Sequence, residues 1–310
     1  MIISASRRTD IPAFFSEWFC QRIKEQYVLV RNPMNIHQVS RIDLSPEVVD
    51  CIVFWTKNPK PMLSRLDELH DYAYYFQFTL NAYTRDIEAA VPSKNDEVIQ
   101  TFLALSDKIG KKRVIWRYDP ILINPHYSAE YHLKYFTRLA EMLDGKFEHC
   151  VISFIDYYKK IASALKANEI EELPSETVEM LARELSQIAK RMGFKIKTCA
   201  EKYDLSRYGI EHSKCVDDKL IERIAGGRLD LSKDKNQRVE CGCVESIDIG
   251  QYNTCMHGCK YCYANYSPRS VAENFRKYDP SSPLLCSQLM EEDKITERAM
   301  RALIDRQLEL

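Results

Sequence analysis

Short runs rich in β-branched and aromatic residues alternate along the chain with longer amphipathic segments. The runs that predict strands are Ile2–Ser6, Val48–Trp55, Tyr74–Leu80, Arg113–Tyr118, Cys150–Ile155, Phe194–Cys199 and Val244–Ile249. The segments that predict helices between them include Asn95–Ile109, Ala129–Leu143 and Ser175–Met192. Such alternation indicates a parallel sheet. We expect one α/β domain over residues 1–283, a complete or partial TIM-barrel-like parallel barrel, with residues 284–310 as a helical segment packed on it.

Polar side chains follow each predicted strand. In a parallel barrel the carboxyl ends of the strands meet on one rim, where the functional residues of TIM barrels lie. The side chains expected on this rim include Arg7, Arg8, Asp10, Lys57, Arg117, Asp119 and Glu201. Any one of them taken alone is as well explained by a solvated loop. As a set they predict a charged active-site mouth, with Lys57, Arg117, Asp119 and Glu201 as candidate catalytic residues.

Three cysteines share one tight loop after the last predicted strand. Cys255, Cys259 and Cys262 have the spacing C-x3-C-x2-C, and three thiolates of one loop can bind three irons of a [4Fe–4S] cluster. The fourth iron is then open to S-adenosylmethionine (SAM), whose S–C bond an electron can cleave. The alternative is a zinc ion bound by these thiols and His257. Iron–sulfur is favoured because zinc ribbons usually pair C-x2-C knuckles.

The loop resembles the signature of the radical SAM superfamily, C-x3-C-x-φ-C, with Tyr261 at the aromatic φ position. The resemblance implies a [4Fe–4S] cluster, SAM as cofactor and a Tyr261 ring near the SAM adenine. Tyr263 and the Tyr-Ala-Asn continuation are similar to radical SAM proteins of the spore-photoproduct-lyase kind. By analogy alone, this makes DNA photolesion repair a variant of the same hypothesis.

More of the chain resembles a bacterial family of unestablished activity, domain of unknown function 1848. The matching segments are Ser-Ala-Ser-Arg-Arg-Thr-Asp-Ile-Pro from Ser4, Phe-Trp-Thr-Lys-Asn-Pro from Phe54, Arg-Tyr-Asp-Pro from Arg117, and Cys241-Gly-Cys243 leading to the Cys255 loop. The family is described by the same cysteine cluster. The resemblance therefore supports the cofactor and leaves the substrate open.

Two features depart from the radical SAM pattern. The cysteine motif follows the last strand and not the first, which a circular permutation would explain, with Val244–Ile249 beside Ile2–Ser6. The Gly-Gly-Glu motif that binds the SAM amino group is also missing. We therefore expect the turn after the first strand to bind SAM instead. The residues predicted for that role are Ser4, Arg7, Arg8 and Asp10, because Arg binds carboxylates and Asp accepts from amino groups.

Four further cysteines precede the motif. Cys199 closes a predicted strand, Cys215 follows in a loop, and Cys241 and Cys243 form a C-x-C pair. Clustered cysteines in a reducing compartment usually indicate metal binding or catalysis. We expect a second metal site here, an auxiliary iron–sulfur cluster or a zinc ion. The alternative is a buried core thiol at Cys199 and an incidental Cys215.

Composition narrows the function classes. With 44 basic and 45 acidic residues, the formal net charge is −1, so no basic excess favours nucleic-acid binding. An apolar stretch long enough for a transmembrane helix and a secretory signal are both missing, so a cytoplasmic protein is expected. The radical SAM reading implies an unknown substrate and an electron donor such as flavodoxin or ferredoxin. The alternatives are a non-SAM iron–sulfur electron-transfer or sensor protein and a zinc-stabilised binding protein.

Overall fold

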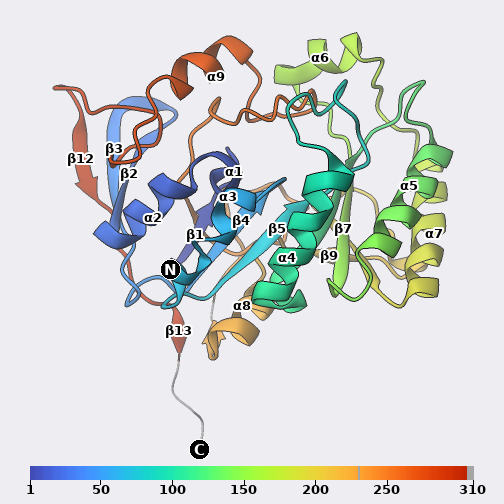
Figure 1. Ribbon diagram of the computed structural model, residues 1–310, viewed down its shortest axis with the longest axis horizontal. Helices are drawn as coiled ribbons and strands as arrows, with labels where there is room; N and C mark the ends of the chain where they lie inside the picture. The colour runs from blue at the N-terminus through green and yellow to red at the C-terminus, as the bar shows by residue number, and fades with distance from the viewer. Residues whose placement is uncertain (230, 306–310) are drawn as a thin grey trace, which may run out of the picture.

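Eight parallel strands form the central sheet of the computed structural model, which describes residues 1–229 and 231–305 (Figure 1). The strand order is β11-β1-β4-β5-β6-β7-β8-β9, and each neighbouring pair is parallel. The strands are β1 Ile2–Ala5, β4 Cys51–Thr56, β5 Tyr74–Thr79, β6 Val114–Ile121, β7 His149–Phe154, β8 Lys195–Cys199, β9 Glu211–Ser213 and β11 Ile247–Asp248. The predicted α/β fold with a parallel sheet is confirmed. Within the described residues, β9 and β11 at the two ends of this order do not pair with each other.

The first and last predicted strands are neighbours. Strand β1 pairs with β11 in parallel, with Ile3 opposite Ile247 and Ser4 opposite Asp248. This adjacency was predicted from the sequence and is confirmed. Because both strands run the same way, the turn after β1 and the loop after β11 leave the same edge of the sheet.

Helices cover one face of the sheet, and among them α5 packs against α7 (Figure 1). The helices are α1 Ile11–Phe14, α2 Ser16–Glu25, α3 Lys60–Leu63, α4 Ile99–Ile109, α5 Ala129–Met142, α6 Ala162–Ala167, α7 Ser175–Met192, α8 Asp218–Ala225 and α9 Pro268–Phe275. Short 3₁₀ or π turns lie at Leu66–Leu69, Lys94–Val98, Lys111–Arg113, Lys159–Ile161 and Ser206–Tyr208. Helix α7 buries Leu181, Leu185 and Ile188 and ends at Gly193, whose φ of +77° suits glycine.

The strands are buried on both faces, which explains their nearly continuous apolar sequences. In β4, Ile52 and Phe54 pack in the core under the helices, whereas Cys51 and Val53 face the opposite side. The alternation follows the two-residue period of a strand. The second side is covered by a smaller apolar cluster that includes Val216, Leu220, Ile221 and Val244 from the segment after β9.

The prediction of a helical segment over residues 284–310 is wrong for the part that the structure describes. That part holds two strands, β12 Lys294–Glu297 and β13 Ile304–Asp305, and residues 306–310 lie outside the described chain. Strand β12 extends the small sheet of β2 Tyr27–Asn32 and β3 Asn35–Asp43, and β13 pairs with β10 Arg228–Leu229. All four residues of β12 are exposed. With no apolar face to bury, this segment gains more from pairing with the open edge of β3.

None of the helices in the described part of the chain combines the length and the apolar character that crossing a bilayer requires.

Candidate functional site

A cavity of about 470 Å³ opens where the strands of the central sheet end. Its walls come from the turn after β1, the ends of β4, β6, β7 and β8, and the loop that follows β11. A concave site of this size, with charged groups converging on it, is the usual form of a small-molecule site. Both groups of cysteines that the sequence singled out line it: Cys255, Cys259 and Cys262, and Cys199, Cys215, Cys241 and Cys243.

The loop of Cys255, Cys259 and Cys262, here called the cysteine loop, is fixed by one asparagine. The Asn265 Oδ1 atom accepts hydrogen bonds from the backbone N–H groups of Thr254 and Cys255, each at 2.8 Å. Its Nδ2 donates to the Arg8 carbonyl at 3.0 Å. One side chain therefore orients the first thiol and ties the loop to the turn after β1. The predicted proximity of these two segments is confirmed.

The other side of the cysteine loop pairs with residues 87–90. The Lys260 N–H donates to the Ile87 carbonyl and the Ala90 N–H donates to the His257 carbonyl, both at 2.9 Å. Gly258 adopts φ of +65°, and a Cβ there would lie 3.3 Å from the Ala89 side chain. The small residue between the first two thiols lets the loop turn and approach this segment closely.

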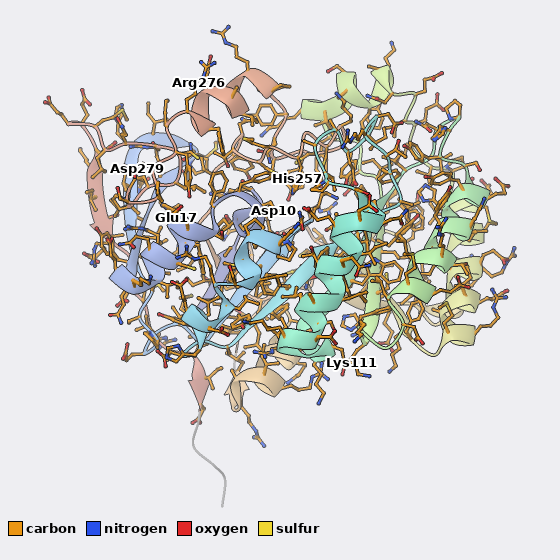
Figure 2. The ribbon with its side chains drawn as sticks, in the orientation of Figure 1. Asp10, Glu17, Lys111, His257, Arg276 and Asp279 are labelled. Atoms are coloured by element: carbon orange, nitrogen blue, oxygen red, sulfur yellow. The ribbon has the colours of Figure 1, made fainter. Side chains whose placement is uncertain are left out.

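Asp10 connects three segments next to the cysteine loop. Its carboxylate accepts from the backbone N–H groups of Ala13 at 3.0 Å and Lys57 at 2.7 Å, and lies 2.8 Å from His257 Nε2 (Figure 2). Asp10 was predicted to accept from the SAM amino group, but these protein donors already engage both carboxylate oxygens. His257 Nε2 is thus the donor to Asp10, which leaves Nδ1 as its unengaged ring nitrogen.

A buried charge network lies beside the cysteine loop. The Glu88 carboxylate bonds the Lys57 ammonium at 2.7 Å and the Tyr261 hydroxyl at 2.5 Å, and also contacts the Lys94 ammonium. Burial by itself raises the pKa of Glu88, but the two ammonium groups outweigh it and lower the pKa to about 2. Burial lowers the pKa of Lys57, but Glu88 and Cys259 outweigh this and raise it. Lys57 is therefore a fixed cation near Cys259.

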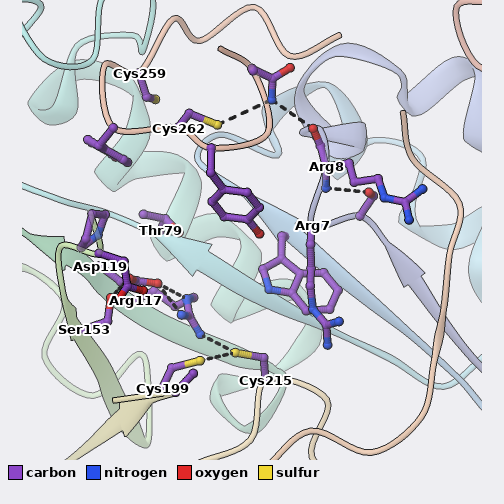
Figure 3. A pocket seen from close by; sticks show the side chains of 18 of the residues that line it. Arg7, Arg8, Thr79, Arg117, Asp119, Ser153, Cys199, Cys215, Cys259 and Cys262 are labelled. Carbon is purple, nitrogen blue, oxygen red and sulfur yellow. Dashed lines mark hydrogen bonds and ion pairs between the residues drawn. The ribbon is translucent and has the colours of Figure 1, made fainter. Parts of the chain in front are cut away.

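Arg117 and Asp119 lie between the two cysteine groups (Figure 3). The Arg117 Nε donates to Asp119 Oδ2 at 2.9 Å, and its Nη1 donates to Cys215 Sγ at 3.0 Å and to Gln77 Oε1 at 3.2 Å. Burial raises the pKa of Asp119, but the guanidinium and a hydrogen bond from Ser153 outweigh it and lower the pKa. The two candidate catalytic residues thus form an ion pair that faces the cavity.

The second cysteine group, here called the four-thiol group, forms the opposite wall. Cys199 Sγ and Cys215 Sγ lie 2.8 Å apart, and Cys243 Sγ accepts from the backbone N–H groups of Cys215 at 3.2 Å and Val216 at 3.4 Å. Cys241 contacts Cys243, and this contact lowers the pKa of the Cys241 thiol to about 7. Among residues 1–229 and 231–305, however, no three His, Cys, Asp or Glu side chains already surround the position of a single metal ion.

Two predicted site residues do not line this cavity. Ser4 is buried in the sheet, where its hydroxyl donates to Asp248 Oδ2 at 2.9 Å. Glu201 lines a separate small pocket and accepts from the Phe154 N–H at 2.7 Å. Burial raises the pKa of Glu201 to about 8, so its carboxyl is largely protonated near neutral pH.

Comparison with known proteins identifies the family. The sequence profile of the family described as domain of unknown function (DUF1848) matches residues 2–264. The chain belongs to this family. No curated protein matches it significantly. Among solved structures, one from Bacteroides thetaiotaomicron, provisionally described as an alpha-L-fucosidase, shares 11% identity over 72% of this chain and 82% of its own, with a TM-score of 0.26. A likeness that low assigns neither fold nor activity.

Several residues in or beside the cavity of this DUF1848 chain were not fully recognised from the sequence. Glu88 sits in a loop between two predicted elements, where nothing in the sequence distinguishes it from a solvated carboxylate. Thr9 lies within a quoted motif, and His257 was considered only as a ligand of the alternative zinc site. The structure reveals that Thr9 Oγ1 and His257 Nδ1 are buried beside the cavity and lack a hydrogen-bond partner. Arg238 reaches the cavity from the segment before the C-x-C pair and contacts Asp156.

Proposed function

We propose that this DUF1848 chain is an enzyme of the radical SAM type, with a [4Fe–4S] cluster on Cys255, Cys259 and Cys262. The observation that carries the proposal is that these thiols and Tyr261 line one cavity at the carboxyl edge of a parallel sheet. The parallel β11–β1 pair supports a partial barrel circularly permuted relative to radical SAM proteins. In that arrangement β11 takes the place of their first strand.

The residues present fit the cluster. Each thiolate of a cubane binds a different iron, so three cluster ligands do not converge on one point as the ligands of a single ion do. That agrees with three cysteines spaced along one loop that lines the cavity. When bound, the cluster would supply an open iron for SAM and the electron that cleaves its S–C bond.

The chain's own groups would bind and orient SAM. Thr9 Oγ1 and His257 Nδ1 are buried, unpaired and beside the cysteine loop, so they are available to the amino and carboxylate end of a ligand. The Tyr261 hydroxyl is held by Glu88, which fixes the ring that would flank the adenine. Lys57 offsets negative charge near Cys259.

Arg117 and Asp119 face the same cavity and would contact the substrate. In their ion pair the Asp119 carboxylate stays ionised, so it can accept a hydrogen bond from a substrate donor. An electron donor such as flavodoxin or ferredoxin would complete the system.

The test is anaerobic SAM cleavage. Reconstituted, dithionite-reduced protein is incubated with SAM, and 5′-deoxyadenosine is followed by chromatography. We expect slow product formation that Cys255→Ala abolishes and that Cys150→Ala preserves, since Cys150 is a buried thiol of β7 outside the cavity. Iron and sulfide without SAM binding or cleavage would favour an iron–sulfur electron-transfer or sensor protein. Zinc without sulfide would favour a zinc-stabilised binding protein.

A further inference from the structure

The four-thiol group gathers cysteines from three segments that are distant in sequence. Cys199 ends β8, Cys215 follows β9, and Cys241 and Cys243 precede β11. Three of them are buried and Cys199 is partly buried, yet all four line the cavity. Isolated core thiols pack singly among apolar side chains, whereas these contact one another: Cys199 with Cys215 at 2.8 Å, and Cys241 with Cys243.

Hydrogen-bond donors are directed at these sulfurs. Cys243 Sγ accepts from two successive backbone N–H groups, those of Cys215 and Val216, and Cys215 Sγ accepts from Arg117 at 3.0 Å. A neutral thiol is a weak acceptor, but a thiolate gains from each donor, especially from a cation. These donors would stabilise thiolates, the form of sulfur that binds metals.

Positive charge surrounds the same sulfurs. The Arg117 guanidinium contacts Cys215 directly, and Arg7, which stacks over the Trp55 ring at 5.1 Å, interacts electrostatically with Cys215 and Cys243. The Arg7 Nη2 atom is buried without a hydrogen-bond partner. Asp119 pairs with Arg117 and Asp248 interacts electrostatically with Arg7, but neither engages the buried Arg7 Nη2 atom. A metal centre bound by four thiolates, which carries net negative charge, would compensate the Arg7 guanidinium further.

We propose that Cys199, Cys215, Cys241 and Cys243 bind a second metal centre of the four-thiolate class, separate from the cysteine loop. Zinc and iron–sulfur clusters share this ligand chemistry. A single zinc ion would require these side chains to rotate until the four sulfurs surround one point, whereas a cluster would bind each sulfur through a different iron. With four protein ligands the centre has no open position, so it stabilises the wall of the cavity that faces the cysteine loop.

The experiment separates the two centres by removing the cysteine loop thiols. Iron, zinc and acid-labile sulfide are measured in anaerobically purified Cys255→Ala/Cys259→Ala/Cys262→Ala protein. We expect it to retain about one zinc per chain without sulfide, or about four irons with matching sulfide. Adding Cys241→Ala and Cys243→Ala should lower that metal at least tenfold, whereas adding Cys150→Ala should not. A triple variant already free of metal would overturn the proposal.

X-ray absorption at the edge of the retained metal keeps the test independent of how the five-site variant folds. In the triple variant the first coordination sphere should contain sulfur only. Nitrogen or oxygen ligands in the majority, or a disulfide between Cys199 and Cys215 found by mass spectrometry of the freshly isolated protein, would contradict a four-thiolate centre. The proposed radical SAM function fails by a different result, namely equal iron content and no SAM cleavage in the wild type and the triple variant.

Discussion

The two cysteine groups line opposite walls of one cavity, but the chain builds them in different ways. The cysteine loop places its thiols within residues 255–262, where one side chain, Asn265, fixes the backbone at Cys255. The four-thiol group is assembled from the end of β8, the segment after β9 and the segment before β11. The first wall depends on local spacing, and the second depends on the whole sheet being in register.

Each of the two walls contains an ion pair that lies next to a thiol. Beside the cysteine loop, Glu88 holds Lys57 and Lys94, and Lys57 lies near Cys259. Beside the four-thiol group, Asp119 holds Arg117 next to Cys215. In both cases a carboxylate, fully buried at Glu88 and partly buried at Asp119, keeps a cation within reach of a thiol. The following predictions test whether the two ion pairs contribute equally to the free energy of unfolding.

The largest effect is expected at Glu88. Glu88→Gln removes the carboxylate and leaves two ammonium groups in a buried site, which should lower the free energy of unfolding by about 3–5 kcal/mol. Urea unfolding at pH 7, followed by circular dichroism, measures it. The matched control is Glu97→Gln, which loses the exposed pair with Lys60 and should cost less than about 1 kcal/mol. Equal losses in the two variants would mean that the Glu88 network is effectively solvated.

Arg117→Gln tests the other wall. It leaves Asp119 partly buried without its cation, and we expect the free energy of unfolding to fall by about 3 kcal/mol. The double variant Arg117→Gln/Asp119→Asn should recover part of that loss, because the uncompensated charge is gone. If the double variant is as unstable as the sum of the single variants, the pair is not coupled and the two walls differ.

The buried carboxyl of Glu201, two residues after Cys199, leads us to expect a pH dependence of stability. Its pKa is about 8 in the folded chain against an ordinary value of 4.5. As pH rises from 4.5 to 8, the unfolded chain loses this proton while the folded chain keeps it, so the wild type loses stability. Glu201→Gln should remove that loss, and its stability relative to the wild type should rise by on the order of 2 kcal/mol between pH 5 and pH 8. A constant difference between the two proteins across this range would show that Glu201 is ionised in the fold.

The smallest effect is expected at Arg238, which contacts Asp156 at the exposed rim of the cavity. Arg238→Gln should change the free energy of unfolding by less than about 1 kcal/mol, since exposed ion pairs contribute little. Thermal unfolding at low and high salt measures it. A loss comparable to that of Arg117→Gln would place Arg238 among the buried charges that hold the four-thiol wall.

Hydrophobic periodicity predicted the positions of several strands and helices closely. The predicted strands Tyr74–Leu80 and Phe194–Cys199 differ from β5 and β8 by one residue at one end, and the predicted helix over 175–192 is α7. Hydrophobic periodicity did not predict strands whose formation depends on pairing with a backbone segment distant in sequence. Strand β12 is exposed and has no apolar alternation, and it exists because β3 offers it an open edge.

In the candidate site, too, some features were predicted from the sequence and others became known only from the fold. Spacing alone singled out Cys255, Cys259 and Cys262, because ligands from one loop must lie close in sequence. Only the fold showed which hydrogen-bond and ion-pair partners each polar residue has. Asp10 was expected to be a free acceptor, but its oxygens are engaged by Ala13, Lys57 and His257.

By itself, the sequence determined the parallel α/β class, the adjacency of the first and last strands, and the loop that carries three thiols. The class and the loop depend on hydrophobic periodicity and on local spacing, which act over a few residues, whereas the adjacency of the strands was inferred from the resemblance to radical SAM proteins. The clustering of four cysteines was also predicted, but only the tertiary structure decided that Glu88 is a buried counter-ion and that Glu201 lies outside the main cavity. Burial and electrostatic pairing depend on which segments meet in space, and a linear pattern does not encode those distances.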